Sequence, residues 1–89
     1  MLTVHLLISG KVQGVFYRAT AKKIAEELSL KGWIKNIAGH KVEAVISGED
    51  SQVNEFIKWC KEGPPGANVD DVAISDLPGA EFPEFKIIR

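Results

Sequence analysis

The stretch "GKVQGVFYR", residues 10–18, joins a predicted strand to a predicted helix. The first backbone N–H groups of a helix need hydrogen-bond partners, which a Ser, Thr, Asp or Asn side chain usually supplies. None of these residue types occurs between Lys11 and Arg18. The sequence therefore predicts a helix start without a side-chain cap, and something else must satisfy its N–H groups.

The residues on either side of this join indicate the two elements. The preceding segment has an apolar residue at every second position, which predicts a strand with one apolar face: Leu2, Val4, Leu6 and Ile8. The following segment has apolar residues at helical spacing: Ala21, Ile24, Ala25 and Leu28. This spacing predicts an amphipathic helix from Tyr17 to Leu28.

The rest of the chain adds more strands and one more helix. Alternating apolar residues and flanking turn residues predict strands at Trp33–Ile37, 42–47, Val69–Leu77 and Phe85–Arg89. Residues 38–40 form the expected turn of a hairpin. The second helix is expected to have Asp50 or Ser51 as its N-cap and to end at Gly63.

This β-α-β-β-α-β order, followed by a last strand, predicts an α+β fold of the ferredoxin-like βαββαβ type. Right-handed crossovers place both helices on one face of a mostly antiparallel sheet. The first and second strands then run parallel with the third between them, so both end at the same edge, roughly 10 Å apart. The loop before Arg18 and the region of Asn36 should therefore converge on one small ligand.

The loop itself suggests what that ligand is. Gly14 allows backbone conformations that other residues avoid, so the following N–H groups can curl into a concave nest at the helix start. Such nests bind anions. The phosphate-binding groups are expected to be the N–H groups of Gly14, Val15, Phe16, Tyr17 and Arg18. The guanidinium of Arg18 adds a planar donor fork that suits phosphate, although the spacing alone fits an ordinary glycine loop with a surface arginine equally well.

Two better-known phosphate-binding motifs do not fit this stretch. A Walker loop ends in Gly-Lys-Ser/Thr immediately before its helix, whereas here Gly10 and Lys11 come early and Val12 follows them. The glycine spacing of a dinucleotide-binding fingerprint is also absent, and no parallel α/β series follows.

Composition limits the class of protein. A chain of 89 residues with 45% hydrophobic and 26% charged residues predicts one globular domain, residues 1–89. A net charge of −1 gives no broad basic field for nucleic acid. The single Cys60 excludes an internal disulfide. The apolar N-terminal stretch is too short to span a membrane and is a poor signal peptide, so no membrane association and a cytoplasmic location are expected.

Four stretches together resemble the acylphosphatase family. They occur in the family's order: "GKVQGVFYR" at 10–18, "GWIKN" at 32–36, "GPPGANV" at 63–69 and "FKIIR" at 85–89. The resemblance implies a βαββαβ sandwich that hydrolyses small acyl phosphates. No cluster of His, Cys or carboxylate residues lies near the two motifs in the sequence, so neither a metal nor another cofactor is expected. By position, Arg18 resembles the family's phosphate-binding arginine, and Asn36 resembles the asparagine that holds the attacking water. Phosphate and sulfate are expected to inhibit, and the protein is expected to be a monomer.

Three positions carry further expectations. Phe16 occupies a slot where the family often has a smaller residue, which could alter access to the pocket. Ser29 stands where a glycine is common at the helix end and should cost a little stability. The resemblance extends to the last strand, so Arg89 is expected to assist groups around Arg18.

Competing functions use the same scaffold. An RNA-binding module would need the aromatic-rich RNP1 pattern, and the third strand offers no aromatic residue for base stacking. An anion sensor, or an accessory domain of a larger carbamoyl-transfer protein, is the other alternative. His5, His40 and Cys60 are interpreted as structural or solvent-exposed, because no paired ligands at metal spacing accompany them.

Overall fold

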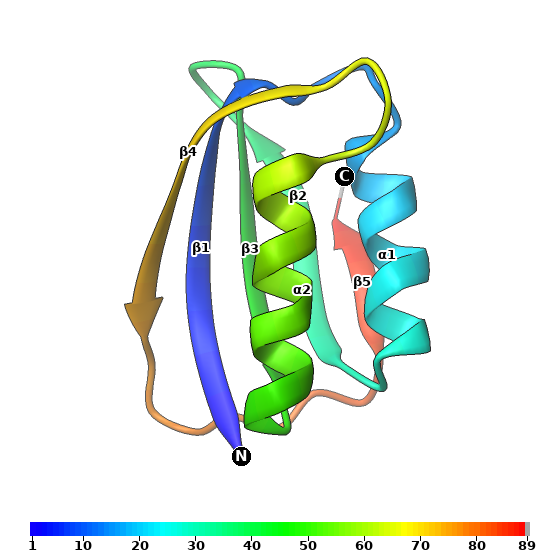
Figure 1. Cartoon of the computed structure of the whole chain (residues 1–89). Helices are drawn as coiled ribbons and strands as arrows, with labels where there is room; N and C mark the ends of the chain where they lie inside the picture. The colour runs from blue at the N-terminus through cyan, green and yellow to red at the C-terminus, as the bar shows by residue number, and fades with distance from the viewer. Residues whose placement is uncertain (89) are drawn as a thin grey trace.

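Two helices cover one face of a five-stranded sheet in the computed structural model (Figure 1). The structure describes residues 1–88, so the expected role of Arg89 lies outside the described residues. The strands are β1 (Leu2–Lys11), β2 (Lys31–Ile37), β3 (Lys41–Gly48), β4 (Asn68–Asp76) and β5 (Phe85–Ile88), and the helices are α1 (Tyr17–Glu27) and α2 (Asp50–Glu62). The predicted ferredoxin-like α+β fold is confirmed.

The sheet has the strand order β4-β1-β3-β2-β5. β3 pairs antiparallel with both β1 and β2, so β1 and β2 run parallel to each other, as the sequence predicts. Their carboxyl ends, Lys11 and Ile37, therefore lie at the same edge of the sheet. β5 pairs parallel with β2 and makes the sheet mixed.

β1 continues to Lys11, three residues beyond the last residue of its alternating pattern. The pairing register between β1 and β4 shifts between Ser9 and Gly10, which lets β1 stay paired with β4 past the irregularity. Gly10 has a φ of 126°, and a Cβ there would clash with the carbonyl oxygen of Asn68. Only glycine fits this close approach, and the extended strand brings the following loop to the edge of the sheet.

The end of α1 gives a physical reason why Ser29 is expected to cost a little stability. This residue has a φ of 58°, in the left-handed region that favours glycine. Its N–H donates to the carbonyl of Glu26 at 3.1 Å, and the N–H of Leu30 donates to the carbonyl of Ala25 at 2.8 Å. This pair of bonds is a Schellman motif, so Ser29 occupies a position that glycine would fill without strain.

The expected side-chain cap of α2 is wrong. The helix begins at Asp50, so the N-cap is Glu49, which has an extended backbone and makes no side-chain capping bond. The N–H of Val53 donates to the carbonyl of Glu49 at 2.9 Å and closes the first turn. Because Asp50 already lies inside the helix, its carboxylate faces the positive helix end from the first turn instead of capping it.

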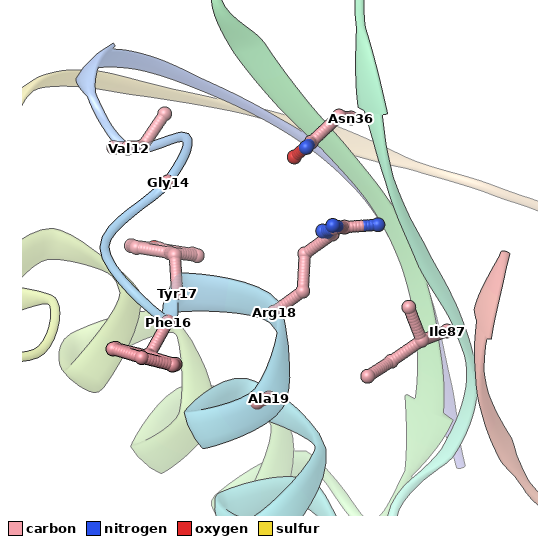
Figure 2. Close-up of a pocket in the computed structure, with 8 residues that line it drawn as sticks. All are labelled: Val12, Gly14, Phe16, Tyr17, Arg18, Ala19, Asn36 and Ile87. Carbon is pink, nitrogen blue, oxygen red and sulfur yellow. The ribbon is translucent and has the colours of Figure 1, made fainter. Parts of the chain in front are cut away.

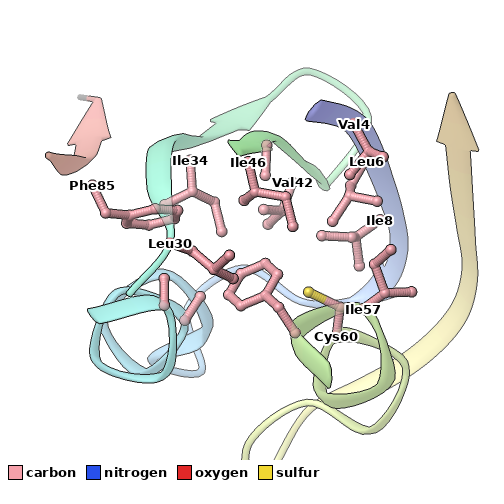
Figure 3. Packing of buried hydrophobic residues seen from close by; sticks show 14 of the residues in the cluster. Val4, Leu6, Ile8, Leu30, Ile34, Val42, Ile46, Ile57, Cys60 and Phe85 are labelled. Atoms are coloured by element: carbon pink, nitrogen blue, oxygen red, sulfur yellow. The ribbon is translucent and has the colours of Figure 1, made fainter. Parts of the chain in front are cut away.

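The hydrophobic core lies between the helices and the sheet (Figure 3). The side chains of Phe56 and Phe85 are almost completely buried, with ring centroids 6.1 Å apart. Cys60 is also buried there, as its interpretation as a structural residue requires. Truncating a buried phenylalanine such as Phe56 to alanine typically costs about 3–5 kcal/mol, so this cluster holds α2 and β5 to the sheet.

The face of the sheet away from the helices is more polar. His5 and Glu43 are linked there by a 2.8 Å contact between Nε2 and Oε2, and Lys35 Nζ lies 3.6 Å from Glu43 Oε1. The hydrogen bond from His5 is the main cause that lowers the pKa of the Glu43 carboxyl. His5 is thus engaged in a side-chain pair, in agreement with its structural interpretation.

Candidate functional site

A cavity of about 250 Å³ opens at the edge of the sheet where β1 and β2 end (Figure 2). It is bounded by the loop after β1, the first turn of α1, β2 and β5. The residues that line it are Val12, Gly14, Phe16, Tyr17, Arg18, Ala19, Asn36 and Ile87. The predicted convergence of the loop and β2 is therefore observed.

The loop backbone has two residues in the left-handed region. Gly14 has a φ of 74°, and Phe16, the N-cap of α1, has φ 61° and ψ 23°. A Cβ at Gly14 would meet no atom within 4 Å, so the glycine is needed for its backbone conformation and not for lack of space.

The start of α1 is uncapped, as the sequence predicts. Phe16 makes no side-chain capping bond, and its carbonyl accepts the first helical hydrogen bond, from Thr20 at 3.0 Å. Within residues 1–88, no N–H group from Gly14 to Arg18 donates a loop or cap hydrogen bond. These donors at the positive end of a helix dipole have the character of an anion-binding site.

Gln13 attaches this loop to the neighbouring hairpin. Its Nε2 donates to the carbonyl oxygens of Ile37 and Lys41, both at 2.9 Å. The two acceptors flank the β2–β3 turn, next to Asn36. Gln13 therefore fixes the loop relative to the strand that carries Asn36. The sequence does not predict these two hydrogen bonds, because both acceptors lie far from Gln13 along the chain.

The side chain of Tyr17 anchors the start of α1 to α2. It is 1% exposed, its hydroxyl donates to the carbonyl of Cys60 at 2.7 Å, and its ring centroid lies 5.1 Å from that of Trp59. Burial raises the pKa of Tyr17 far above its ordinary value, so the phenol stays protonated and donates. Burial likewise raises the pKa of the Cys60 thiol to about 12, which makes this thiol a poor nucleophile.

Arg18 extends from α1 into the cavity, and its guanidinium points towards the amide of Asn36 (Figure 2). Within the described residues it makes no ion pair. The first turn of α1 also contains no acidic residue. The charge of Arg18 therefore adds to the positive potential of the helix start and makes the cavity attractive to an anion.

Asn36 faces the loop from β2. Its Oδ1 is buried and has no hydrogen-bond partner within residues 1–88. An unsatisfied buried polar atom typically costs about 1–3 kcal/mol, so a ligand or water that hydrogen-bonds there would recover that free energy. Among the described residues, this oxygen is therefore an acceptor left free for a ligand or a water molecule.

The cavity brings together most of the residues that the sequence proposes for the site. Gly14, Phe16, Tyr17 and Arg18 line it together with Asn36, whereas Val15 does not. The side chain of Val15 packs against the hydrophobic core instead, so only its backbone remains a candidate. Three lining residues were not anticipated: Val12, Ala19 and Ile87.

Comparison with known proteins identifies the family. The family model for acylphosphatase matches residues 4–87. The chain belongs to the acylphosphatase family. An acylphosphatase of Marinobacter nauticus is 49% identical over 92% of this chain and 90% of its own length. Membership of the acylphosphatase family supports hydrolysis of acyl phosphates as the activity.

Solved acylphosphatase structures share the fold over nearly the whole chain. That of the Coxiella burnetii acylphosphatase has a TM-score of 0.94 and 39% identity and covers 98% of this chain and 92% of its own. That of the Bacillus subtilis acylphosphatase has a TM-score of 0.96 and 29% identity and covers both chains completely.

Residues 1–88 contain no group of three or more His, Cys, Asp or Glu side chains placed to hold a metal ion. None of the helices in that part of the chain has the length and apolar character needed to cross a membrane.

Proposed function

We propose that this protein hydrolyses acyl phosphates to a carboxylate and inorganic phosphate, with Arg18 and Asn36 as the catalytic residues. One observation carries the proposal: within residues 1–88, N–H groups without partners at an uncapped helix start, a guanidinium and an amide oxygen without a partner all lie at one cavity. The first two groups suit a phosphoryl anion, and the third suits a water molecule.

The phosphoryl group binds to the loop. The N–H groups of Gly14, Val15, Phe16, Tyr17 and Arg18 donate to its non-bridging oxygens, and the Arg18 guanidinium donates a second set of hydrogen bonds. Preorganised donors of this kind stabilise the negative charge of the transition state without reorganisation during the reaction. Gln13 and the Tyr17 hydroxyl support the geometry, because they hold the loop to the hairpin and the helix start to α2.

Asn36 positions the nucleophile. Its Oδ1 accepts a hydrogen bond from a water molecule and directs the water oxygen at phosphorus. The new P–O bond forms as the bond between phosphorus and the acyl oxygen breaks, and the carboxylate leaves with that electron pair. A phosphoryl oxygen accepts the proton of the water, so the products are a carboxylate and dihydrogen phosphate.

The leaving group explains why so few residues suffice. A free carboxylic acid has a pKa near 4, so the carboxylate leaves as an anion and needs no general acid. Phosphoryl transfer then depends mainly on positioning and charge stabilisation. We therefore propose that neither a metal nor another cofactor takes part.

The proposal also covers the domain organisation, the oligomeric state, the location and the partners of this protein. Residues 1–89 act as a single domain and a monomer in the cytoplasm, with a small acyl phosphate as substrate and no nucleic-acid or membrane partner. Inorganic phosphate and sulfate compete with the substrate, because both present the tetrahedral anion that the loop would bind.

Turnover of benzoyl phosphate with and without EDTA tests this function. We expect hydrolysis at the same rate in both conditions, inhibited competitively by phosphate. Loss of turnover in EDTA that Mg²⁺ or Zn²⁺ restores would contradict the metal-free mechanism. Phosphate binding by calorimetry without any turnover would instead favour an anion-binding module on the same scaffold.

A further inference from the structure

Phe16 is unusual among the aromatic residues of this protein. Its residue surface is 82% exposed, whereas Phe56 and Phe85 are buried in the core. Among residues 1–88, it is the only aromatic residue that is exposed to solvent. A large apolar side chain on the surface forgoes the favourable free energy of burial, so any benefit of this ring must come from what it contacts at the surface.

The backbone of Phe16 adds a second cost. With φ 61° and ψ 23° it occupies the left-handed region, where glycine or asparagine is less strained than an aromatic residue. The loop could keep this conformation with a small residue. Neither the core nor the helix cap gains from the ring, because Phe16 is exposed and makes no side-chain capping bond.

The place of Phe16 at the cavity provides the missing reason. It lines the cavity from the loop side, while Asn36 lines it from β2 (Figure 2). In phosphoryl transfer the attacking and leaving oxygens lie roughly in line through phosphorus. If Asn36 holds the water on the strand side, the acyl group leaves towards the loop side, where the ring of Phe16 is exposed.

A second apolar side chain lines the cavity in addition to Phe16. Ile87 of β5 also lines the cavity, so the polar groups of the site are bordered by apolar residues from two separate elements. The volume, about 250 Å³, is below the roughly 300–1,000 Å³ typical of pockets for drug-sized ligands. Such a site has room for a phosphoryl group and a small acyl group.

We infer that Phe16 is a specificity-determining residue that contacts the acyl group and makes the enzyme prefer acyl phosphates with an apolar, preferably aromatic, acyl group. This inference rests on the proposed function and names the substrate class of the same site. Aromatic rings in contact stabilise each other beyond the effect of buried area, and a short acetyl group offers little surface to the ring.

The test compares kcat/KM for benzoyl phosphate with kcat/KM for acetyl phosphate in the same enzyme. The ratio of the two is compared between wild type and Phe16→Asn, since asparagine tolerates the left-handed backbone. Differences in the intrinsic reactivity of the two substrates cancel in this comparison. We expect the benzoyl preference to fall by about threefold to tenfold in Phe16→Asn and to persist in Phe16→Tyr, which keeps the ring.

Leu77→Asn is the matched control. Leu77 is another exposed apolar residue, 39% exposed, and it follows β4 outside the cavity lining. Its variant should keep the wild-type ratio. Inhibition by inorganic phosphate, which has no acyl group, should persist in Phe16→Asn and shows that the loop is intact.

The outcomes separate this inference from the proposed function. A wild-type ratio in Phe16→Asn, with turnover and phosphate inhibition intact, would overturn the role of Phe16 and leave the proposed function standing. Equal losses for both substrates together with lost phosphate inhibition would also overturn it, because the residue would then only support the loop. Wild-type enzyme without activity on either substrate would contradict the proposed function itself.

Discussion

The starts of the two helices make an informative comparison. In the part of the chain that the structure describes, neither α1 nor α2 has a side-chain capping bond at its N-terminus. α2 nevertheless carries Asp50 in its first turn, and the N-terminal ammonium group of Met1 lies 3.9 Å from Asp50 Oδ1. The first turn of α1 contains no acidic residue and carries Arg18 instead.

The difference concerns the sign of the charge at each helix end. A helix N-terminus has a partial positive charge, so the carboxylate of Asp50 stabilises α2 from within the chain. Arg18 places a further positive charge at the same kind of position and is unfavourable for α1 alone. The start of α1 is therefore less stable than it would be with an acidic residue in its first turn. An anion bound from solution would supply the negative charge that Asp50 supplies to α2.

Arg18→Ala should have the largest effect. We expect kcat/KM for benzoyl phosphate to fall by about 10³-fold or more and phosphate binding to disappear, because the proposed mechanism has the guanidinium contact the phosphoryl group in both ground and transition states. Arg18→Lys should also lose most activity, since an ammonium group cannot form the bidentate fork. Steady-state kinetics and calorimetry with phosphate measure both.

The stability of the same variant sharpens the comparison. Without phosphate, Arg18→Ala should unfold at the same denaturant concentration as wild type or a slightly higher one, because it removes a positive charge from a positive helix end. Lys23→Ala, an exposed residue farther along α1, is the control and should keep wild-type activity. A clearly destabilised Arg18→Ala would indicate a structural role for the arginine.

Asn36→Ala should have the next largest effect, on turnover alone. We expect kcat to fall by about 10²-fold while the phosphate dissociation constant stays near wild type, as when a group acts on the water and not on the anion. Asn36→Asp keeps the shape but places a negative charge beside the incoming anion, and it should also weaken phosphate binding. Asn54→Ala, an exposed asparagine on α2, is the matched control. Wild-type turnover in Asn36→Ala would refute its assigned role.

Phosphate should stabilise the folded protein through α1. At about 100 times its dissociation constant, an anion that binds only the folded state adds roughly 2.7 kcal/mol to the free energy of unfolding. Chemical denaturation in phosphate and in chloride at matched ionic strength measures this difference, which should vanish in Arg18→Ala. An equal gain in that variant would mean that phosphate acts elsewhere.

Asp50→Asn should have the smallest effect and complete the comparison. Removing the carboxylate from the first turn of α2 should lower the free energy of unfolding by about 0.3–1 kcal/mol. Activity should not change, because Asp50 lies outside the cavity lining. If the variant kept wild-type stability in urea denaturation, a negative charge would not stabilise the start of α2. The same effect could then not be expected from an anion at the start of α1.

Much of this protein follows from local sequence patterns. Alternation in β1 and helical spacing in α1 depend on residues a few positions apart, so the order of the elements could be derived without a structure. The uncapped start of α1 could also be predicted, because a missing Ser, Thr, Asp or Asn is visible in the sequence itself. The meeting of Arg18 and Asn36 then followed from the topology, since β1 and β2 had to end at one edge. The cap of α2 was predicted wrongly, because Asp50, Ser51 and the preceding residues offered several starts one position apart.

Other features were decided only by the tertiary structure, because their partners lie far away in the chain. The acceptors of Gln13 are carbonyl groups 24 and 28 residues later, and that of the Tyr17 hydroxyl lies 43 residues later. From the sequence, Val15 and Phe16 were predicted alike, as residues whose backbone N–H groups bind the anion. Packing turned the side chain of Val15 towards the core and left the ring of Phe16 exposed at the cavity. Local patterns determine backbone conformation and amphipathic faces, whereas contact between distant residues depends on how all the elements pack together.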